Sequence, residues 1–335
     1  MSQKYEKVAL IGLGLIGSSL THAMRRANLA GTITGHAKSA ETRKTALDIG
    51  LVDEIFEDPI DAVKDADLII LCVPVGVCKT IMEIIAPHLK PGATLTDVGS
   101  VKGAIVRDLE PLVPDNIHFI PGHPIAGTEH SGPTAGFAEL FDGRWCILTP
   151  LKDADQKAVD QLRDFWIECG SSVELMTPEH HDLVLAITSH VPHLIAYNIV
   201  GTASDLERVT KSEVVKFSAA GFRDFTRIAA SDPVMWRDIF LNNKDAVLEM
   251  LGRFHEDITA LQKAIRWEDG DALLELFTRT REIRRGIIDA GQETELPDFG
   301  RATTAQPVEP TDATKPTNLT EPTNLAKPGK IDSNK

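Results

Sequence analysis

The feature that most constrains this fold is a glycine-rich turn near the start of the chain. Residues 8–18 (VALIGLGLIGS) begin as an apolar run and continue into Gly12-x-Gly14-x-x-Gly17, and a helical pattern follows at once. A strand, a tight turn and a helix in this order are the context that a dinucleotide-binding fingerprint requires, so the pattern predicts binding of a dinucleotide. Gly12 permits the sharp turn, Gly14 lets a pyrophosphate approach the backbone, and Gly17 lets the helix pack closely. The alternative is a glycine-rich turn in another βα unit.

The residues after the second predicted strand leave the choice of cofactor open. The position where such folds usually place an acid for the adenine ribose holds His36, and Lys38 and Arg43 follow. These two cations could bind the 2′-phosphate of NADP, or they could be solvated charges at a helix start. We therefore expect NAD or NADP. The candidate cofactor-binding residues are Gly12, Gly14, Leu15, Ile16, Gly17, His36, Lys38, Val73, Pro74 and Ser100.

Strands and helices alternate over the first half of the chain. After the first strand, further strands are predicted at 29–36, 67–75, 93–100, 117–120, 145–149 and 173–176. This alternation predicts an α/β fold with a doubly wound, mostly parallel sheet. Ligands of such sheets bind beyond the carboxyl ends of the strands. Ser100 and His123 both follow a predicted strand, and His123 lies in a rigid Pro-Gly-His-Pro loop, so both are expected to face that crevice.

The pattern becomes helical after Thr177. A threonine cap and Pro178 mark a helix start, and no strand is predicted before about residue 289. A second helix is predicted to start at Asp232. Apolar residues at alternating spacings of four and three form a seam on one long predicted helix, namely Val247, Leu251, Phe254, Ile258, Leu261 and Ile265. Such a seam favours packing against a second subunit, although an ordinary core helix would also show it.

These patterns divide the chain into three parts. We predict a dinucleotide-binding Rossmann domain over residues 1–177 and a helical substrate and dimerisation domain over residues 178–298. Residues 299–335 are rich in proline, threonine and asparagine and repeat the sequence PTNL. A segment of this composition cannot bury enough apolar surface to fold alone, so a disordered tail is expected.

Composition argues against several classes of partner. The formal net charge of −14 over 335 residues disfavours binding to nucleic acid or to an anionic membrane. No apolar run reaches the length of a membrane span, and the N-terminus does not resemble a signal peptide. The four cysteines form no CxxC pair. Buried free thiols and a cytoplasmic location are therefore expected.

Three groups of polar residues could carry chemistry. His123 is suited to general base catalysis near neutral pH, and Ser100 could hydrogen-bond an alcohol or the base, but structural roles are equally open for both. His190 and His193 have a metal-ligand spacing, yet no third ligand stands at a suitable distance, so no metal is expected. Arg227 and its neighbour Arg223 suit a small carboxylated substrate, unless they form surface salt bridges.

Five motifs together resemble the prephenate/arogenate dehydrogenase family. They occur in the family's order, over about the first 290 residues, as GLGLIGSS (12–19), DVGSVK (97–102), GHPIAGTEHSG (122–132), TSHVPH (188–193) and GFRDFTRIAASDPVMWRDIF (221–240). The resemblance implies a Rossmann domain followed by an all-helical dimerisation domain. It also implies an enzyme of tyrosine biosynthesis that decarboxylates prephenate to 4-hydroxyphenylpyruvate, or arogenate to tyrosine, with hydride transfer to NAD(P).

The resemblance also assigns roles to individual residues. It implies that His123 accepts the substrate hydroxyl proton with help from Ser100, and that Arg227 grips a carboxylate. The other substrate-binding residues that it implies are His193, Glu129 and Trp236. The expected partners are a small-molecule substrate and a second copy of the chain. Two rival functions remain, a hydroxyacid or imine dehydrogenase of similar fold and a non-catalytic sensor of the cofactor.

Overall fold

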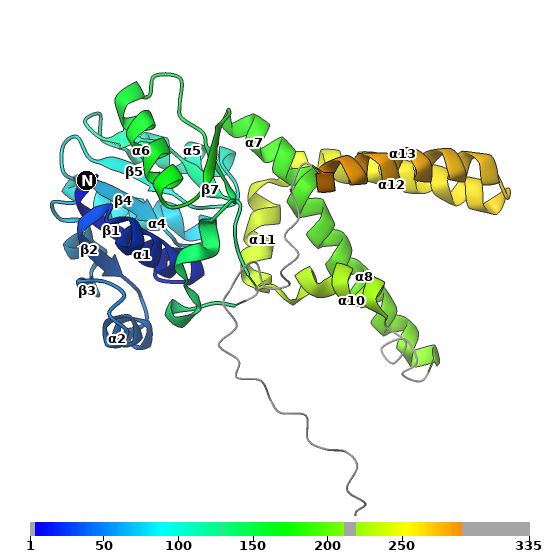
Figure 1. Cartoon of the computed structure of the whole chain (residues 1–335), viewed down its shortest axis with the longest axis horizontal. Coiled ribbons are helices and arrows are strands. Elements are labelled where there is room, and N and C mark those ends of the chain that lie inside the picture. Colours follow the sequence, from blue (N-terminus) through cyan, green and yellow to red (C-terminus); the bar gives the residue numbers. More distant parts are fainter. Residues whose placement is uncertain (1–3, 129, 211–218, 290–335) are drawn as a thin grey trace, which may run out of the picture. The chain divides into compact units, whose positions relative to one another are not determined.

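A six-stranded parallel sheet forms the centre of the N-terminal half in the computed structural model, which describes residues 4–128, 130–210 and 219–289 (Figure 1). The strand order is β3-β2-β1-β4-β5-β6. Its strands are β1 (Tyr5–Ile11), β2 (Ala30–His36), β3 (Glu54–Phe56), β4 (Leu68–Leu71), β5 (Thr94–Asp97) and β6 (His118–Phe119). The predicted parallel sheet is confirmed, with strands shorter than predicted and with β3 missed by the sequence analysis.

Alternate residues of β1 point into two different cores. Val8 and Leu10 belong to the core on one face of the sheet, and Ala9 and Ile11 belong to the core on the other. A strand buried on both faces reads as a continuous apolar run, as this one does. The covering helices are α1 (Leu15–Ala27) and α6 (Gln156–Glu168) on one face and α3 (Pro59–Val63), α4 (Val75–Ile85) and α5 (Gly103–Leu109) on the other, with α2 (Ala40–Asp48) following β2. The fold is therefore doubly wound.

A second, three-stranded sheet follows the first. It contains β7 (Gly122–Pro124), β8 (Trp145–Leu148) and β9 (Ser172–Leu175) in that order. The prediction that residues 122–124 form a loop is wrong, because they pair antiparallel with β8 and place His123 opposite Ile147. Proline obscured this strand in the sequence. It is tolerated here because β7 lies at the edge of its sheet.

The described residues after Thr177 are helical. Their elements are α7 (Pro178–Leu185), a π-helical turn η5 (Ala186–His190), α8 (Val191–Thr210), α10 (Ala220–Thr226), η6 (Arg227–Ala230), α11 (Pro233–Asn242), α12 (Lys244–Arg266) and α13 (Gly270–Asp289). The two predicted helix starts are confirmed, since the side chains of Thr177 and Asp232 cap α7 and α11. Short 3-10 turns in the first half are η1 (Ala86–His88), η2 (Glu110–Leu112), η3 (Pro133–Ala135) and η4 (Ala138–Phe141).

The predicted apolar seam lies on α12, which contacts the antiparallel helix α13 (Figure 1). At its N-terminal end Val247 is buried, whereas Ile258 is 45% exposed and Ile265 is 66% exposed. The single helix is thus confirmed, but the described part of this chain leaves two of the six seam residues exposed. Leu274 and Phe277 of α13 are also exposed. Exposed apolar side chains on neighbouring helices are typical of a surface that binds another protein.

One described helical stretch, Pro178–Asp205, is long and apolar enough to cross a membrane by length and composition. The sequence-based statement that no run reaches this length is therefore wrong. Helix α7 and turn η5 within it nevertheless pack against α12 and against α5 of the first half. The predicted domain boundaries remain predictions, and the predicted tail lies outside the described residues.

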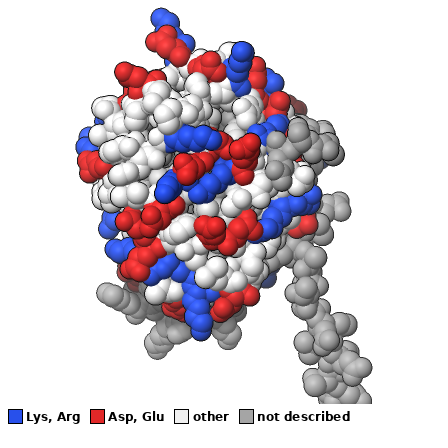
Figure 2. Space-filling model, turned by 90° about the vertical axis from the view of Figure 1, so that its left-hand side faces the viewer, with Lys and Arg blue, Asp and Glu red and all other residues white. Residues whose placement is uncertain are grey.

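One face of the molecule shows how the charged side chains are distributed. Figure 2 shows lysines and arginines interspersed with aspartates and glutamates over this face. Nucleic-acid-binding surfaces instead gather basic residues into a patch or stripe. The described residues of this face therefore have the mixed pattern of an ordinary solvated surface.

Candidate active site

The glycine turn after β1 has the geometry that a bound pyrophosphate needs. Gly12 has a φ of +106°, and a Cβ there would lie 2.5 Å from the carbonyl oxygen of Cys72. A Cβ at Gly17 would clash with the carbonyl oxygen of Gly12. At Gly14, in contrast, a Cβ would meet no atom within 4 Å. Two glycines are thus required by close packing, while the third borders open space into which a ligand fits.

The N-terminus of α1 is available to a ligand. Gly14 precedes the helix and provides no side-chain cap, so the N–H groups of the first turn, which Leu15 and Ile16 begin, are left for an anion. Val73 follows the adjacent strand β4, and its side chain borders Gly12. Pro74 precedes α4 in the same loop. These predicted cofactor residues therefore meet at the carboxyl edge of the sheet, and they fit a dinucleotide.

The residues at the end of β2 do not form a free cationic site. His36 is buried, and burial is the main cause that lowers its pKa below the usual value, so the ring is neutral at pH 7. Arg43 donates to the carbonyl oxygens of Ala37 and Lys38 and forms an ion pair with Glu57 at 2.8 Å. Of the two predicted cations, Arg43 is thus already engaged, and the Glu57 carboxylate would repel a 2′-phosphate beside it.

A cavity of about 310 Å³ lies between the carboxyl edge of the strands and the helical half. This volume suits a small organic ligand. Its lining combines residues of both halves, namely Ser100, His123, Pro124, Ile125, Ala126, Gly127, Thr128, Leu140, Arg144, Leu185, Ser189, His193, Arg227, Ile228, Ser231, Met235, Trp236 and Ile239. The structure therefore brings together five of the predicted site residues from distant parts of the sequence: Ser100, His123, His193, Arg227 and Trp236.

His123 is buried on β7 and borders this cavity. Burial, and then electrostatic interaction with His181, Lys102 and His190, lower the pKa of His123 well below its usual value. The ring is therefore neutral at physiological pH and has a lone pair with which to accept a proton. Ser100 lines the same cavity after β5, and its backbone contacts the ring of His190.

His193 and Trp236 form one wall of the cavity. Their rings are stacked with centroids 3.6 Å apart, and His193 Nδ1 bonds to the carbonyl oxygen of Ser189 at 2.9 Å. His190, the other histidine of the candidate metal spacing, contacts Asn243 Nδ2 at 3.0 Å through its own Nδ1. The two histidines therefore have separate partners. Glu129, the remaining predicted substrate residue, lies outside the described residues.

Two arginines approach the cavity from different elements. Arg227 begins η6 in the helical half, and Arg144 precedes β8. Arg223, in contrast, is exposed and pairs with its neighbour Asp224, so the predicted cluster of two arginines contributes only Arg227. Arg144 was not predicted, because a lone arginine before a strand has no distinguishing sequence signal.

Two family models match adjacent parts of the chain. The nucleotide-binding domain of prephenate dehydrogenase matches residues 20–175, and the dimerization domain of prephenate dehydrogenase matches residues 177–279. The chain belongs to the prephenate dehydrogenase family. This prephenate dehydrogenase family member is accordingly an oxidoreductase that uses NAD(P), with a Rossmann domain followed by a helical domain.

Individual relatives support the same assignment. The chain is 42% identical over 283 residues to cyclohexadienyl dehydrogenase of Zymomonas mobilis, covering 84% of this chain and 96% of that protein. Prephenate dehydrogenase of Aquifex aeolicus, solved with hydroxyphenyl propionate and NAD+, is 36% identical with a TM-score of 0.79, covering 86% of this chain and 99% of that one. Arogenate dehydrogenase of Synechocystis is 29% identical with a TM-score of 0.71, covering 84% and 99%.

Sequence analysis of this family member missed a buried ion pair beneath the cavity. The side chains of Lys102 and Asp97 are fully buried, and Lys102 Nζ lies 2.5 Å from Asp97 Oδ2 and 2.6 Å from the carbonyl oxygen of Gly122. Asp97 also accepts from the backbone N–H groups of Gly99 and Gly122. The pair therefore ties the loop that presents Ser100 to the strand that presents His123. The only sequence signal was a lysine within the DVGSVK motif.

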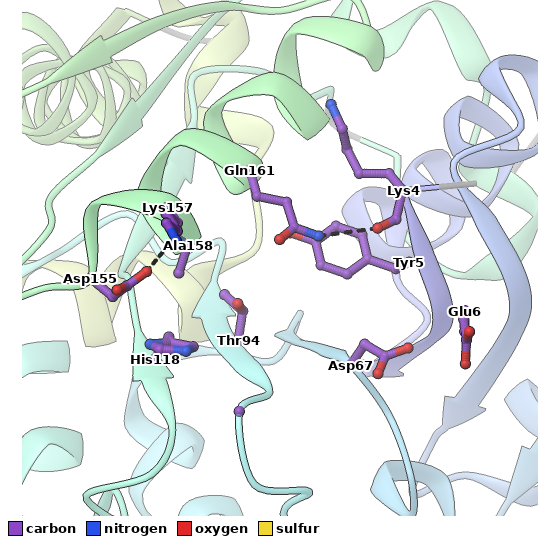
Figure 3. A pocket seen from close by; sticks show the side chains of 11 residues that line it. Lys4, Tyr5, Glu6, Asp67, Thr94, His118, Asp155, Lys157, Ala158 and Gln161 are labelled. Atoms are coloured by element: carbon purple, nitrogen blue, oxygen red, sulfur yellow. Dashed lines mark hydrogen bonds between the residues drawn. The ribbon is translucent and has the colours of Figure 1, made fainter. Parts of the chain in front are cut away.

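A second cavity, of about 530 Å³, lies at the opposite edge of the larger sheet (Figure 3). It is lined by Tyr5, Thr94 and His118, which lie in the first two residues of their strands, so it opens at the amino ends. Ligands of open parallel sheets bind at the carboxyl ends instead. We therefore assign the active site to the smaller cavity.

Proposed function

We propose that this chain oxidises and decarboxylates prephenate in preference to arogenate, with NAD as the favoured cofactor. One observation carries the proposal: a neutral buried histidine and two arginines border a single cavity at the edge where the dinucleotide turn lies. The reaction needs a proton acceptor for the substrate hydroxyl and cations for two carboxylates. His123, Arg227 and Arg144 supply both.

In this proposal His123 accepts the proton of the substrate hydroxyl and later returns it. When bound, the nicotinamide of the cofactor accepts the hydride from the ring carbon that carries the hydroxyl. His123 accepts the hydroxyl proton as that carbon becomes a carbonyl carbon. Loss of CO2 then makes the ring aromatic, and His123 returns the proton to the oxygen, so the product is a phenol and no net proton is released. His123 thus acts first as a base and then as an acid.

The choice between substrates depends on the charges of the cavity. Prephenate and arogenate both have two carboxylates, but arogenate adds an ammonium group where prephenate has a keto group. Among the described lining residues there are two arginines and no carboxylate. Among these described residues an ammonium group would meet like charges and no carboxylate, whereas a keto group is neutral.

We expect turnover with prephenate and NAD to be the fastest of four mixtures of substrate and cofactor. The kcat/KM for prephenate should exceed that for arogenate by about tenfold, which corresponds to about 1.4 kcal/mol. NADP should bind more weakly than NAD, because Arg43 forms an ion pair with Glu57 and the Glu57 carboxylate repels the 2′-phosphate. The measurement is the absorbance of the reduced nicotinamide in each mixture. If the protein binds cofactor but forms no reduced nicotinamide in any of the four mixtures, the proposed function is refuted.

The two arginines are expected to act on substrate affinity. Arg227→Ala should raise the KM for prephenate about tenfold with little change in kcat, because the lost contact exists before and during the reaction. We expect no larger change in KM, because the Arg227 side chain is exposed and solvent weakens its attraction for a carboxylate. Arg144→Ala should behave in the same way. The matched control is Arg237→Ala, since Arg237 is exposed and pairs with Asp238. An unchanged KM in the Arg227 variant would make that residue structural.

The cellular setting follows from the same proposal. We place the enzyme in the cytoplasm as a homodimer on the pathway to tyrosine. All four cysteines are free thiols, which is compatible with a reducing compartment. The exposed apolar side chains of α12 and α13 support pairing of two copies through the helical half. Binding to nucleic acid or a membrane is not expected for this function.

A further inference from the structure

A chain of buried polar side chains leads from His123 away from the cavity. His123 Nδ1 lies 2.8 Å from Nε2 of His181, which is fully buried on α7. His181 Nδ1 lies 2.8 Å from Asp182 Oδ1. The two histidines are 58 residues apart in the sequence, so only the fold brings them into contact. The proposed function uses His123 but gives no role to the two residues behind it.

Asp182 is held as a hydrogen-bond acceptor. Its Oδ1 accepts from the backbone N–H of Lys102, and its Oδ2 accepts from the backbone N–H of Gly103, both at 2.8 Å. Backbone N–H groups thus donate to both of its oxygens, so each carboxylate oxygen acts as an acceptor in these bonds. His181 must therefore carry its proton on Nδ1.

The position of the ring proton on His123 follows from that on His181. Burial is the main cause that lowers the pKa of His181, so its ring is neutral and its Nε2 has a lone pair. The 2.8 Å contact with His123 then requires a proton on His123 Nδ1. A neutral His123 with a proton on Nδ1 has no proton on Nε2. That bare nitrogen is the one left to accept the substrate hydroxyl proton at the cavity.

We propose that His181 and Asp182 are positioning residues that hold His123 in its Nδ1–H tautomer, so that Nε2 is always the proton acceptor. This inference rests on the proposed function. In the other tautomer, Nε2 would carry a proton and could not act as a base. Orientation of a catalytic histidine by a buried acceptor is a general device, and here a second histidine stands between the base and the carboxylate.

The surroundings show that no other described group competes for His123 Nδ1. The charged and titratable groups that influence the His123 ring are His181, Lys102 and His190. Lys102 Nζ is engaged by Asp97 and Gly122, and His190 Nδ1 by Asn243. Asn243 Nδ2 also bonds to the Asp182 carbonyl oxygen at 2.9 Å and so joins α7 to the start of α12. His181 is thus the partner of His123 that the fold provides.

Two substitutions of His181 separate the tautomer effect from simple packing. His181→Gln keeps a side-chain amide whose oxygen can accept from His123 Nδ1 while its NH2 group faces Asp182. His181→Leu fills the space but accepts nothing. We expect kcat to fall about 100-fold in the leucine variant and less than about fivefold in the glutamine variant, with KM changed less than about threefold in both. Equal losses in the two variants would overturn the proposal, as would full activity of the leucine variant.

Nitrogen-15 NMR of the histidine rings tests the tautomer without substrate. The full-length protein labelled at histidine is measured at pH 7, and the His123 signals are identified by their absence in His123→Asn. We expect Nδ1 to be protonated and Nε2 unprotonated in the wild type and in His181→Gln, and a mixture of tautomers in His181→Leu. His118→Gln, on β6 beside the other cavity, is the matched control and should leave the His123 signals unchanged.

The results can refute the hydrogen-bond inference and the proposed function separately. A protein that is silent with prephenate and arogenate but shows the expected His123 tautomers would refute the function and leave the hydrogen-bond inference standing. A wild-type spectrum with a proton on His123 Nε2 would refute the inference even if turnover is observed.

Discussion

Substitution of His123 by asparagine is expected to lower kcat by about two to four orders of magnitude. The asparagine side chain cannot take up the hydroxyl proton, so the step in which the hydroxyl carbon becomes a carbonyl carbon loses its base. Cofactor affinity should change less than about twofold, because the glycine turn and the N-terminus of α1 are separate from β7. Steady-state turnover with prephenate and direct titration of NAD measure the two quantities.

The pH profile provides a second check on His123. Burial and electrostatic interaction with neighbouring groups lower the pKa of His123, so the neutral base persists as pH falls through the ordinary histidine value of 6.5. The wild-type kcat/KM should therefore stay level through pH 6.5 and decline only below it, and the asparagine variant should lack this decline. His118→Asn serves as a control on a histidine outside the active site. Unchanged turnover in His123→Asn would remove His123 from the mechanism.

Local sequence patterns located the glycine turn and two helix starts, because each of these signals acts within a few neighbouring residues. The glycine turn requires a positive φ at Gly12 and close packing at Gly17, and both are visible as residue types. The caps at Thr177 and Asp232 are equally local. Such features are encoded by residue types at neighbouring positions, which is why sequence alone locates them.

The support of His123 could not be predicted, because it depends on contacts between distant elements. His181 lies next to His180 at the start of a helix, and nothing in the sequence distinguishes the buried ring from the exposed one. Asp182 resembles an ordinary helical acid until α5 is placed against α7. Strand β7 was missed because two prolines flank its histidine and glycine, a pattern that predicts a loop.

The apolar seam of α12 shows a different limit of sequence analysis. Its spacing correctly predicted one long helix, but the spacing is the same whether the covering surface belongs to this chain or to another. The exposure of Ile258 and Ile265 separates the two cases for the described residues, since a core helix would bury them. Periodicity thus identifies the apolar face of the helix, and the exposure of its side chains shows whether this chain covers that face.

Substitution of Lys102 by methionine is expected to lower the free energy of unfolding by about 3–5 kcal/mol. Methionine retains most of the side-chain volume but removes the charge that neutralises Asp97. Asp97 would then be left as a fully buried carboxylate whose only described partners are the backbone N–H groups of Gly99 and Gly122. Urea unfolding, followed by fluorescence, measures the change.

Two controls show whether the loss comes from the uncompensated charge. Adding Asp97→Asn to the lysine variant removes that charge, so the double variant should be more stable than Lys102→Met alone. Arg253→Met breaks an exposed pair with Glu249 on α12 and should cost less than about 0.5 kcal/mol. If the loss of unfolding free energy in the double variant equalled the sum of the losses in Lys102→Met and Asp97→Asn alone, the two residues would act independently. The ion pair would then not be what joins the Ser100 loop to the strand of His123.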